Sequence, residues 1–160
     1  MIFSTQEITI QCPIDYVMKL FKNQDYFKHW QRGLVSFDNL STQIGEVGSK
    51  RRMKIKAAGT VITMTEEITA LDLPHLWEAT YRTSGVLNKQ SNRFRESEIT
   101  INSTAQKVTL WESNSSFKFT GMMRLIGKTQ PKLFTGQNRQ HMEDFKTFAE
   151  AMYTKTWTEN

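Results

Sequence analysis

The chain has 160 residues, 38% of them hydrophobic, and a formal net charge of +5 at neutral pH. A chain of this length can bury about 70% of the surface that its unfolded form exposes, so it needs no disulfide or structural metal in order to fold. The single cysteine, Cys12, excludes an internal disulfide, and no Cys/His spacing indicates a zinc site. We expect one domain over residues 1–160, with no metal and no cofactor.

The first residues have no basic leader followed by an apolar core, and no apolar run reaches 18 residues. We therefore expect a cytoplasmic protein without a transmembrane segment, either a monomer or a homodimer. Basic residues gather in 50–56, where alternation places Arg52, Lys54 and Lys56 on one face of a strand and Met53 and Ile55 on the other. This stretch is typical of a solvated strand face; an anionic partner is the alternative, and no specific nucleic-acid binding is indicated.

The N-terminal third begins as a strand and continues as two short helices. Alternating isoleucines predict a strand over residues 2–11, which Pro13 ends. Helical spacing of apolar residues predicts one short helix after Pro13 and a second over 23–30. Gly33 then marks the return to an extended strand over 34–40.

The middle of the chain is a series of strands with short connections, which make neighbouring strands antiparallel. In the strand expected at residues 60–71, the apolar side chains of Ile62, Met64, Ile68 and Ala70 are expected to share the concave face of the sheet. In the last two strands the alternation of apolar residues is not regular, since Phe94 would point to one face of the sheet and Ile99 and Ile101 to the other. A β-bulge between them would bring all three side chains to the same face. The strands are expected at residues 50–57, 60–71, 76–83, 90–101 and 106–119.

The last third, residues 117–153, is the part around which we expect the fold to be organised. Met142, Phe145, Phe148, Ala149 and Met152 repeat at helical spacing, so they form one apolar stripe along a long helix. Before it, residues 121–136 are expected to form a broken helix, because proline at 131 removes a backbone donor. The stripe requires an apolar surface, and the concave face of the sheet is the available one.

The order of a strand, two short helices, an antiparallel meander and a long C-terminal helix resembles the helix-grip arrangement of the START-like, or SRPBCC, superfamily. The residues that carry the resemblance are Ile8-x-Ile10, the 13–17 stretch PIDYV, Leu20-Phe21, Trp30 and the turn from Gly45 to Gly48 before a basic strand. They look most like the polyketide cyclase/dehydrase branch. The resemblance implies an α+β fold, with a curved antiparallel sheet of six to seven strands around the C-terminal helix, and a hydrophobic cavity between them.

We expect this cavity to bind a hydrophobic small molecule, such as a lipid, an isoprenoid or an aromatic, polyketide-like metabolite. Aromatic residues provide wall or core material, and methionines favour a pliable pocket. The candidate ligand-binding residues are Trp30, Met53, Ile55, Met64, Glu66, Trp77, Tyr81, Phe94, Trp111, Phe117, Phe119, Met122, Ile126 and Phe134.

Two polar residues on the expected inner face are the candidates for catalysis. Glu66 shares its parity with Met64 and could serve as a general base or anchor a ligand, while the hydroxyl of Tyr81 could bind a carbonyl group. Alternatively, a bulge turns Glu66 to solvent or it pairs with Arg82 or Arg95, and Tyr81 is an ordinary core residue.

The sequence leaves enzyme, carrier and interaction module open. No GxSxG, GxGxxG or phosphate-binding loop is present, and the three histidines lack metal-binding spacing, although His29 is a candidate at the cavity mouth. The alternatives to ligand binding are a cyclase or dehydratase that uses Glu66 and Tyr81, and an interaction module. The interaction module would present the basic strand or the exposed part of residues 122–134 to an anionic surface or a protein.

Overall fold

The structure of the chain is a computed structural model that describes residues 1–57 and 59–158, apart from the side chains of residues 57, 133–135, 157 and 158. Its strands form an antiparallel sheet of seven, in the order β1-β7-β6-β5-β4-β3-β2. The strands are β1 (Ile2–Ile10), β2 (Leu34–Asn39), β3 (Lys50–Ala57), β4 (Thr60–Asp72), β5 (Leu76–Thr83), β6 (Val86–Ile101) and β7 (Thr104–Phe119).

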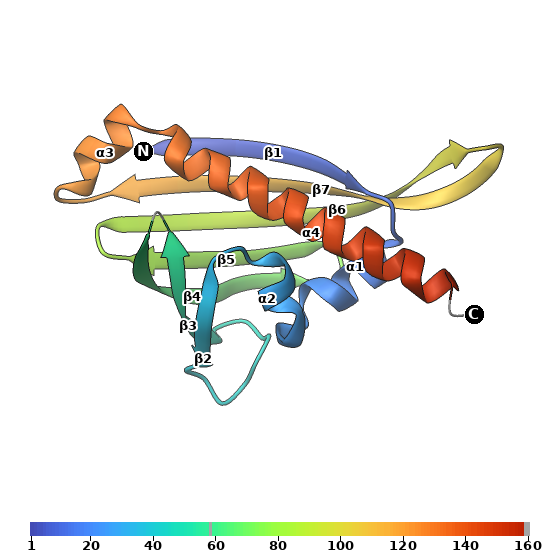
Figure 1. The fold of residues 1–160 in the computed structure, drawn as a ribbon. Coiled ribbons are helices and arrows are strands. Elements are labelled where there is room, and N and C mark those ends of the chain that lie inside the picture. The colour runs from blue at the N-terminus through green and yellow to red at the C-terminus, as the bar shows by residue number, and fades with distance from the viewer. Residues whose placement is uncertain (58, 159–160) are drawn as a thin grey trace.

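The helices α1 (Ile14–Phe21), η1 (Gln24–Tyr26) and α2 (Phe27–Trp30) connect β1, at one edge of the sheet, to β2 at the other. Pro13 caps α1 with an extended backbone, as the sequence predicted for a proline at this boundary. Figure 1 shows that α1 and α2 lie at one end of the sheet, beneath the C-terminal half of the long helix.

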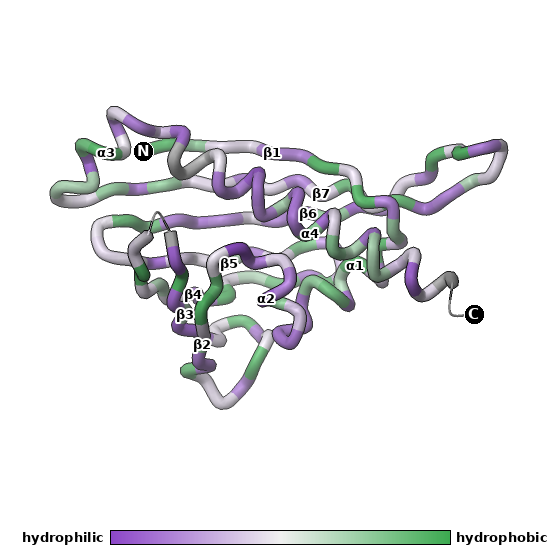
Figure 2. The backbone as a smooth tube through the Cα atoms, in the orientation of Figure 1, coloured by the Kyte–Doolittle hydropathy of each residue, from purple (hydrophilic) through white to green (hydrophobic). Residues whose placement is uncertain are grey.

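The C-terminal region consists of α3 (Met123–Thr129) and the long helix α4 (Lys132–Thr158), with Pro131 between them. The predicted break is therefore confirmed. Of the predicted stripe, Met142, Phe145 and Ala149 are 0% exposed, while Phe148 and Met152 are partly buried against the core. α4 crosses the inner face of the sheet diagonally (Figure 1), and β1, at the edge of the sheet, is hydrophobic near its two ends and hydrophilic between them (Figure 2). None of the described helices combines the length and the apolar composition that crossing a bilayer requires.

The predicted bulge in the last two strands is wrong. β6 and β7 pair in one continuous register from Val86 with Phe119 to Ile101 with Thr104. Ile99 and Ile101 are out of phase with Phe94 because they lie in the part of this hairpin that extends beyond the other strands (Figure 1). Since a free hairpin has no buried face at its tip, alternation there carries no information about the core.

A bulge occurs in β4 instead, where the pairing with β5 shifts between Ile68 and Ala70. The shift turns Ala70 to the outer face, so its expected place beside Ile68 is wrong, and Leu71 pairs with Trp77. Because the bulge comes after Glu66, it leaves that residue on the inner face.

Candidate functional site

A row of polar side chains crosses the inner face of the sheet. Arg51 on β3 pairs with Glu66 on β4, Glu66 with Tyr81 on β5, and Tyr81 with Asn88 on β6. Laterally paired residues of a sheet point to the same side, so the four side chains face the region beneath α3 and α4. We call these four residues the polar row.

A buried ion pair forms one end of the polar row. Nε and Nη2 of Arg51 each lie 3.2 Å from a carboxylate oxygen of Glu66, in a two-pronged arrangement. The side chains are only 4% and 12% exposed. The guanidinium also lies 4.3 Å from the centre of the Phe27 ring and 5.0 Å from that of Phe37. The aromatic rings and the carboxylate together hold Arg51 in one position.

Tyr81 lies next to this ion pair. Burial, the negative charge of Glu66 and a hydrogen bond with Glu66 raise the pKa of the Tyr81 phenol well above its ordinary value of 10.0, and the positive charge of Arg51 opposes the shift. The phenol is therefore neutral at physiological pH. Its O–H donates a hydrogen bond to the Glu66 carboxylate, and the phenolic oxygen keeps lone pairs that can accept a hydrogen bond.

Two atoms of the polar row are buried and make no hydrogen bond with the described part of the chain. They are Nη1 of Arg51, which is a donor, and Oδ1 of Asn88, which is an acceptor. Buried polar atoms without a partner are uncommon in folded proteins because each costs free energy. The row can thus offer a hydrogen-bond donor and an acceptor to a bound molecule.

A second polar cluster joins α4 to the same face. Nε2 of Gln90 donates to Oδ1 of Asn138 at 2.8 Å, and Nδ2 of Asn138 donates to Oγ of Ser113 at 3.2 Å. Further along the face, Nε1 of Trp111 donates to Oδ1 of Asn92 at 3.0 Å. The two bonds of Asn138 hold α4 against β6 and β7, next to the polar row.

Apolar residues beside the polar row are incompletely covered. Ile55, Ile62 and Met64 face inward from β3 and β4, yet each is only partly buried. By contrast, Met53 is buried, as are Phe117 and Phe119 on β7. An inward-facing apolar surface that the protein's own helices leave open is typical of a binding face.

The aromatic residues expected to line a cavity lie in the core. Trp77, Phe94 and Trp111 pack edge-on against Phe21 of α1 at 5.2 to 5.5 Å between ring centres, and Trp30 stacks on Phe21 at 5.4 Å. The expectation that these four form the wall of an open cavity is corrected by the presence of Phe21. Side chains fill this half of the interior.

Three further candidates lie in the 122–134 region. Met122 is 91% exposed and Ile126 is 38% exposed, so neither belongs to an enclosed wall. The reason is that α3 contacts the end of β7 through Gly127, next to the Phe119 ring, and turns these side chains outward. The side chain of Phe134 lies outside the described residues.

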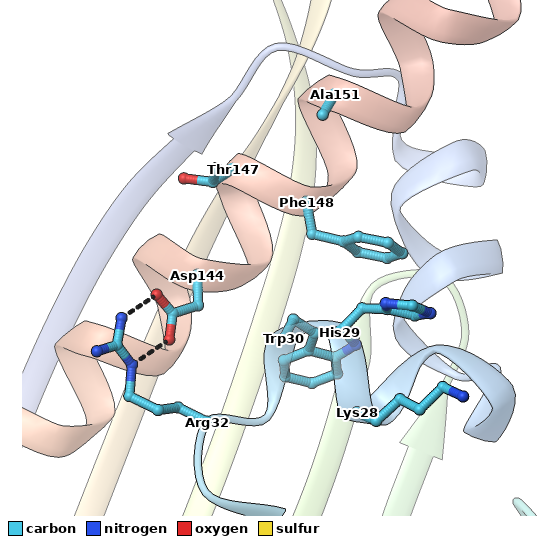
Figure 3. A pocket seen from close by; sticks show the side chains of 8 residues that line it. All are labelled: Lys28, His29, Trp30, Arg32, Asp144, Thr147, Phe148 and Ala151. Carbon is cyan, nitrogen blue, oxygen red and sulfur yellow. Dashed lines mark hydrogen bonds and ion pairs between the residues drawn. The ribbon is translucent and has the colours of Figure 1, made fainter.

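An open groove of about 470 Å³ lies between α2 and α4 (Figure 3). His29 lines it, stacked on Phe148 at 5.6 Å, and Arg32 forms a two-pronged ion pair with Asp144 at its rim. The hydrogen bond from Arg32 holds the pKa of Asp144 below its usual value. The polar row contributes nothing to the lining, so His29 belongs to a separate surface.

Within residues 1–57 and 59–158, no three His, Cys, Asp or Glu side chains gather as a metal site would require. Cys12 is buried, and its Sγ lies 3.6 Å from the carbonyl oxygen of Ala149. Burial, reinforced by the charge of Glu150, raises the pKa of the Cys12 thiol to about 12. Such a thiol remains protonated and serves in packing.

Sequence reasoning missed Arg51 and Asn88. The signal for Arg51 was present, because it shares its parity with Met53 and Ile55, but it was grouped with its basic neighbours. Asn88 lies in a stretch expected to be a connection, whereas β6 already begins at Val86. The expected partners Arg82 and Arg95 were wrong, since Glu66 pairs with Arg51.

The protein is similar to several proteins of known structure. Neither the family models nor the curated proteins include a match to this sequence. TTHA0849 from Thermus thermophilus superposes with a TM-score of 0.67 at 14% identity, over 94% of this chain and 99% of that one. A conserved protein from Geobacillus kaustophilus gives 0.68 at 11%, over 97% of each chain. Ara h 8.0201 gives 0.56 at 11%, over 94% of this chain and 98% of that one.

The chain has the helix-grip fold, which it shares with these structures. The predicted fold class is thereby confirmed, including the curved sheet of seven strands, the long C-terminal helix and the short helices after β1. At sequence identities of 11 to 14%, the structural similarity shows a common fold and does not show a common function. Assignment to the polyketide cyclase branch stays a prediction.

Proposed function

We propose that this helix-grip domain binds a small molecule with an apolar body and one polar group on the inner face of β3 to β6. The observation that carries the proposal is the polar row, which lies beside the partly covered Ile55, Ile62 and Met64. The apolar body would cover these side chains, and the polar group would bind at Arg51 or Asn88. A lipid, an isoprenoid alcohol or an aromatic polyketide-like compound has this form.

The charges favour binding over acid–base catalysis. Glu66 accepts two hydrogen bonds from Arg51, so its carboxylate oxygens are already engaged within the protein. Tyr81 has a raised pKa and so retains its proton. The row therefore presents fixed donors and acceptors, which suit recognition better than proton transfer.

A second candidate is a cyclase or dehydratase. It is favoured by one observation, the contact of Tyr81 with Glu66, because the two candidate groups meet on the inner face. In this role Tyr81 would hold a substrate carbonyl, and Glu66 would accept a proton after release from Arg51. Turnover of a polyketide-like substrate that is lost in Glu66→Gln, with binding retained, would support catalysis.

Titration with 1-anilinonaphthalene-8-sulfonate tests the binding proposal, since this dye has an apolar aromatic body and one polar group. We expect the inner-face variant Ile62→Gln to weaken dye binding about fivefold or more, because it places an amide in the apolar contact. The matched control is Thr63→Gln, which changes the next residue of β4 on the exposed outer face. Equal affinity in both variants, or no dye binding by the folded protein, would overturn the proposal.

A further inference from the structure

One end of the molecule gathers exposed apolar side chains. It is formed by α3, the turn between β5 and β6, and the start of β1 (Figure 1). The backbone N–H of Thr120, just before α3, donates to the carbonyl of Gly85 in this turn at 2.9 Å. Met122 and Leu125 are 91% and 68% exposed, and Phe3 on β1 is 74% exposed. In Figure 2, α3 shows green beside purple at this end of the molecule.

The same end is basic and free of acidic residues. Residues 113–142, which include α3, contain no Asp or Glu, and neither do residues 79–95 around the β5–β6 turn. Within these stretches, Arg82 pairs laterally with Leu87, and Leu87 with Lys118, on the outer face. Arg124 and Lys128 on α3 are also exposed. The excess positive charge of the chain is therefore concentrated next to the exposed apolar residues.

The basic surface continues along the outer face of the sheet. Arg52 on β3 pairs with Thr65, which pairs with Arg82. Lys54 and Lys56 point to the same side as Arg52, and all three are exposed. Acidic residues offset the charge at one end of β3, since Glu67 lies 3.9 Å from Lys50 and Asp38 on β2 pairs laterally with Arg52. Lys54 and Lys56 pair laterally with Thr63 and Val61 of β4, so the outer face keeps an excess of positive charge between β3 and Arg82.

We propose that this end of the molecule docks onto membranes that contain anionic lipids. Met122, Leu125 and Phe3 would enter the boundary between headgroups and acyl chains, and Arg82, Lys118 and the α3 cations would contact lipid phosphates. Charge complementarity selects an anionic bilayer, because a neutral one would leave these cations without partners. The inference rests on the outer surface and on α3, and it is independent of ligand binding on the inner face.

Co-sedimentation with vesicles tests the docking surface. The probe is the full chain with vesicles of phosphatidylcholine alone and with vesicles that contain about 30% phosphatidylglycerol, at low and high salt. We expect binding to the anionic vesicles only, and a loss of at least about tenfold on raising the salt. The double variant Met122→Ser with Leu125→Ser is expected to weaken binding about tenfold, since it removes exposed apolar area without altering charge.

A matched control changes exposed residues far from α3. Val35 on β2 and Val47 in the following loop are 59% and 60% exposed, and their double serine variant should bind vesicles as wild type does. Binding unaffected by the Met122 and Leu125 substitutions, or equally reduced in the control, would overturn the proposal. So would a homodimer in sedimentation velocity that these α3 substitutions dissociate, because α3 would then be an interface between copies. Ile62→Gln should leave vesicle binding unchanged, which separates this test from that of the inner face.

Discussion

Arg51 and Glu66 face each other across β3 and β4 on the inner side of the sheet, whereas Lys50 and Glu67, one residue away, form an ion pair on the outer side. The inner pair is 4% and 12% exposed, and the outer pair is 51% and 40% exposed. The same two strands therefore carry a buried and a solvated version of one interaction.

This contrast predicts different costs for the loss of either cation. Arg51→Met should lower the free energy of unfolding by about 3–5 kcal/mol, since it leaves the Glu66 carboxylate buried without its partner. Lys50→Met should lower it by less than about 1 kcal/mol, because the Glu67 carboxylate remains hydrated. Urea unfolding of both variants measures the difference. Equal costs would mean that Glu66 is not desolvated.

Tyr81 predicts a decline of stability at alkaline pH. Its folded-state pKa lies above the ordinary 10.0, so the unfolded chain loses the phenolic proton first. The stabilisation from Tyr81 is complete below pH 10 and is lost as the pH rises further. Urea unfolding across this range should show a shallower decline in Tyr81→Phe than in wild type. Tyr16→Phe, which alters an exposed hydroxyl near Thr156, should follow wild type; a parallel decline in Tyr81→Phe would contradict the account.

Much of this fold follows from periodicity, and the part that does not has a physical cause. The Met142, Phe145 and Ala149 stripe was predictable because a helix with one apolar face must bury it. The bulge after Ile68 was not predictable, because the local sequence is compatible with Ala70 on either face of the sheet. Alternation placed Glu66 and Tyr81 on one face, but the partner of Glu66 depends on strand order, which no local pattern specifies. For the same reason, the filling of the aromatic half by Phe21 required the position of α1.

Asn138 predicts a stabilising role for the polar contact beneath α4. It bonds Gln90 and Ser113, so Asn138→Ala should remove both bonds, one of them to the fully buried Ser113 hydroxyl, and cost about 1–3 kcal/mol of unfolding free energy. Gln137→Ala, an exposed neighbour on the same helix, should change stability by less than about 0.5 kcal/mol. Thermal or urea unfolding of the two variants measures the difference in stability. A neutral Asn138→Ala would show that α4 is held by its apolar stripe alone.

The absence of a side chain at Gly127 allows α3 to pack closely against the ring of Phe119. A β-carbon at this position would come within 2.6 Å of the Phe119 ring, so Gly127→Ala must displace the ring or the helix and should cost about 1–3 kcal/mol. At Gly136 a β-carbon meets nothing within 4 Å. Gly136→Ala in α4 should therefore stabilise the protein by about 0.5–1 kcal/mol. Similar effects of the two substitutions would show that α3 does not rest on Phe119.

The central claim, that the inner face binds an amphipathic small molecule, is tested most directly by native mass spectrometry. The freshly purified protein, and the protein incubated with a mixture of fatty acids, isoprenoid alcohols and aromatic polyketides, are compared with the denatured mass. We expect an added mass that denaturation removes and that is much reduced in Ile62→Gln but retained in Thr63→Gln. A bare mass under both conditions, or an added mass that Ile62→Gln retains in full, would contradict the account.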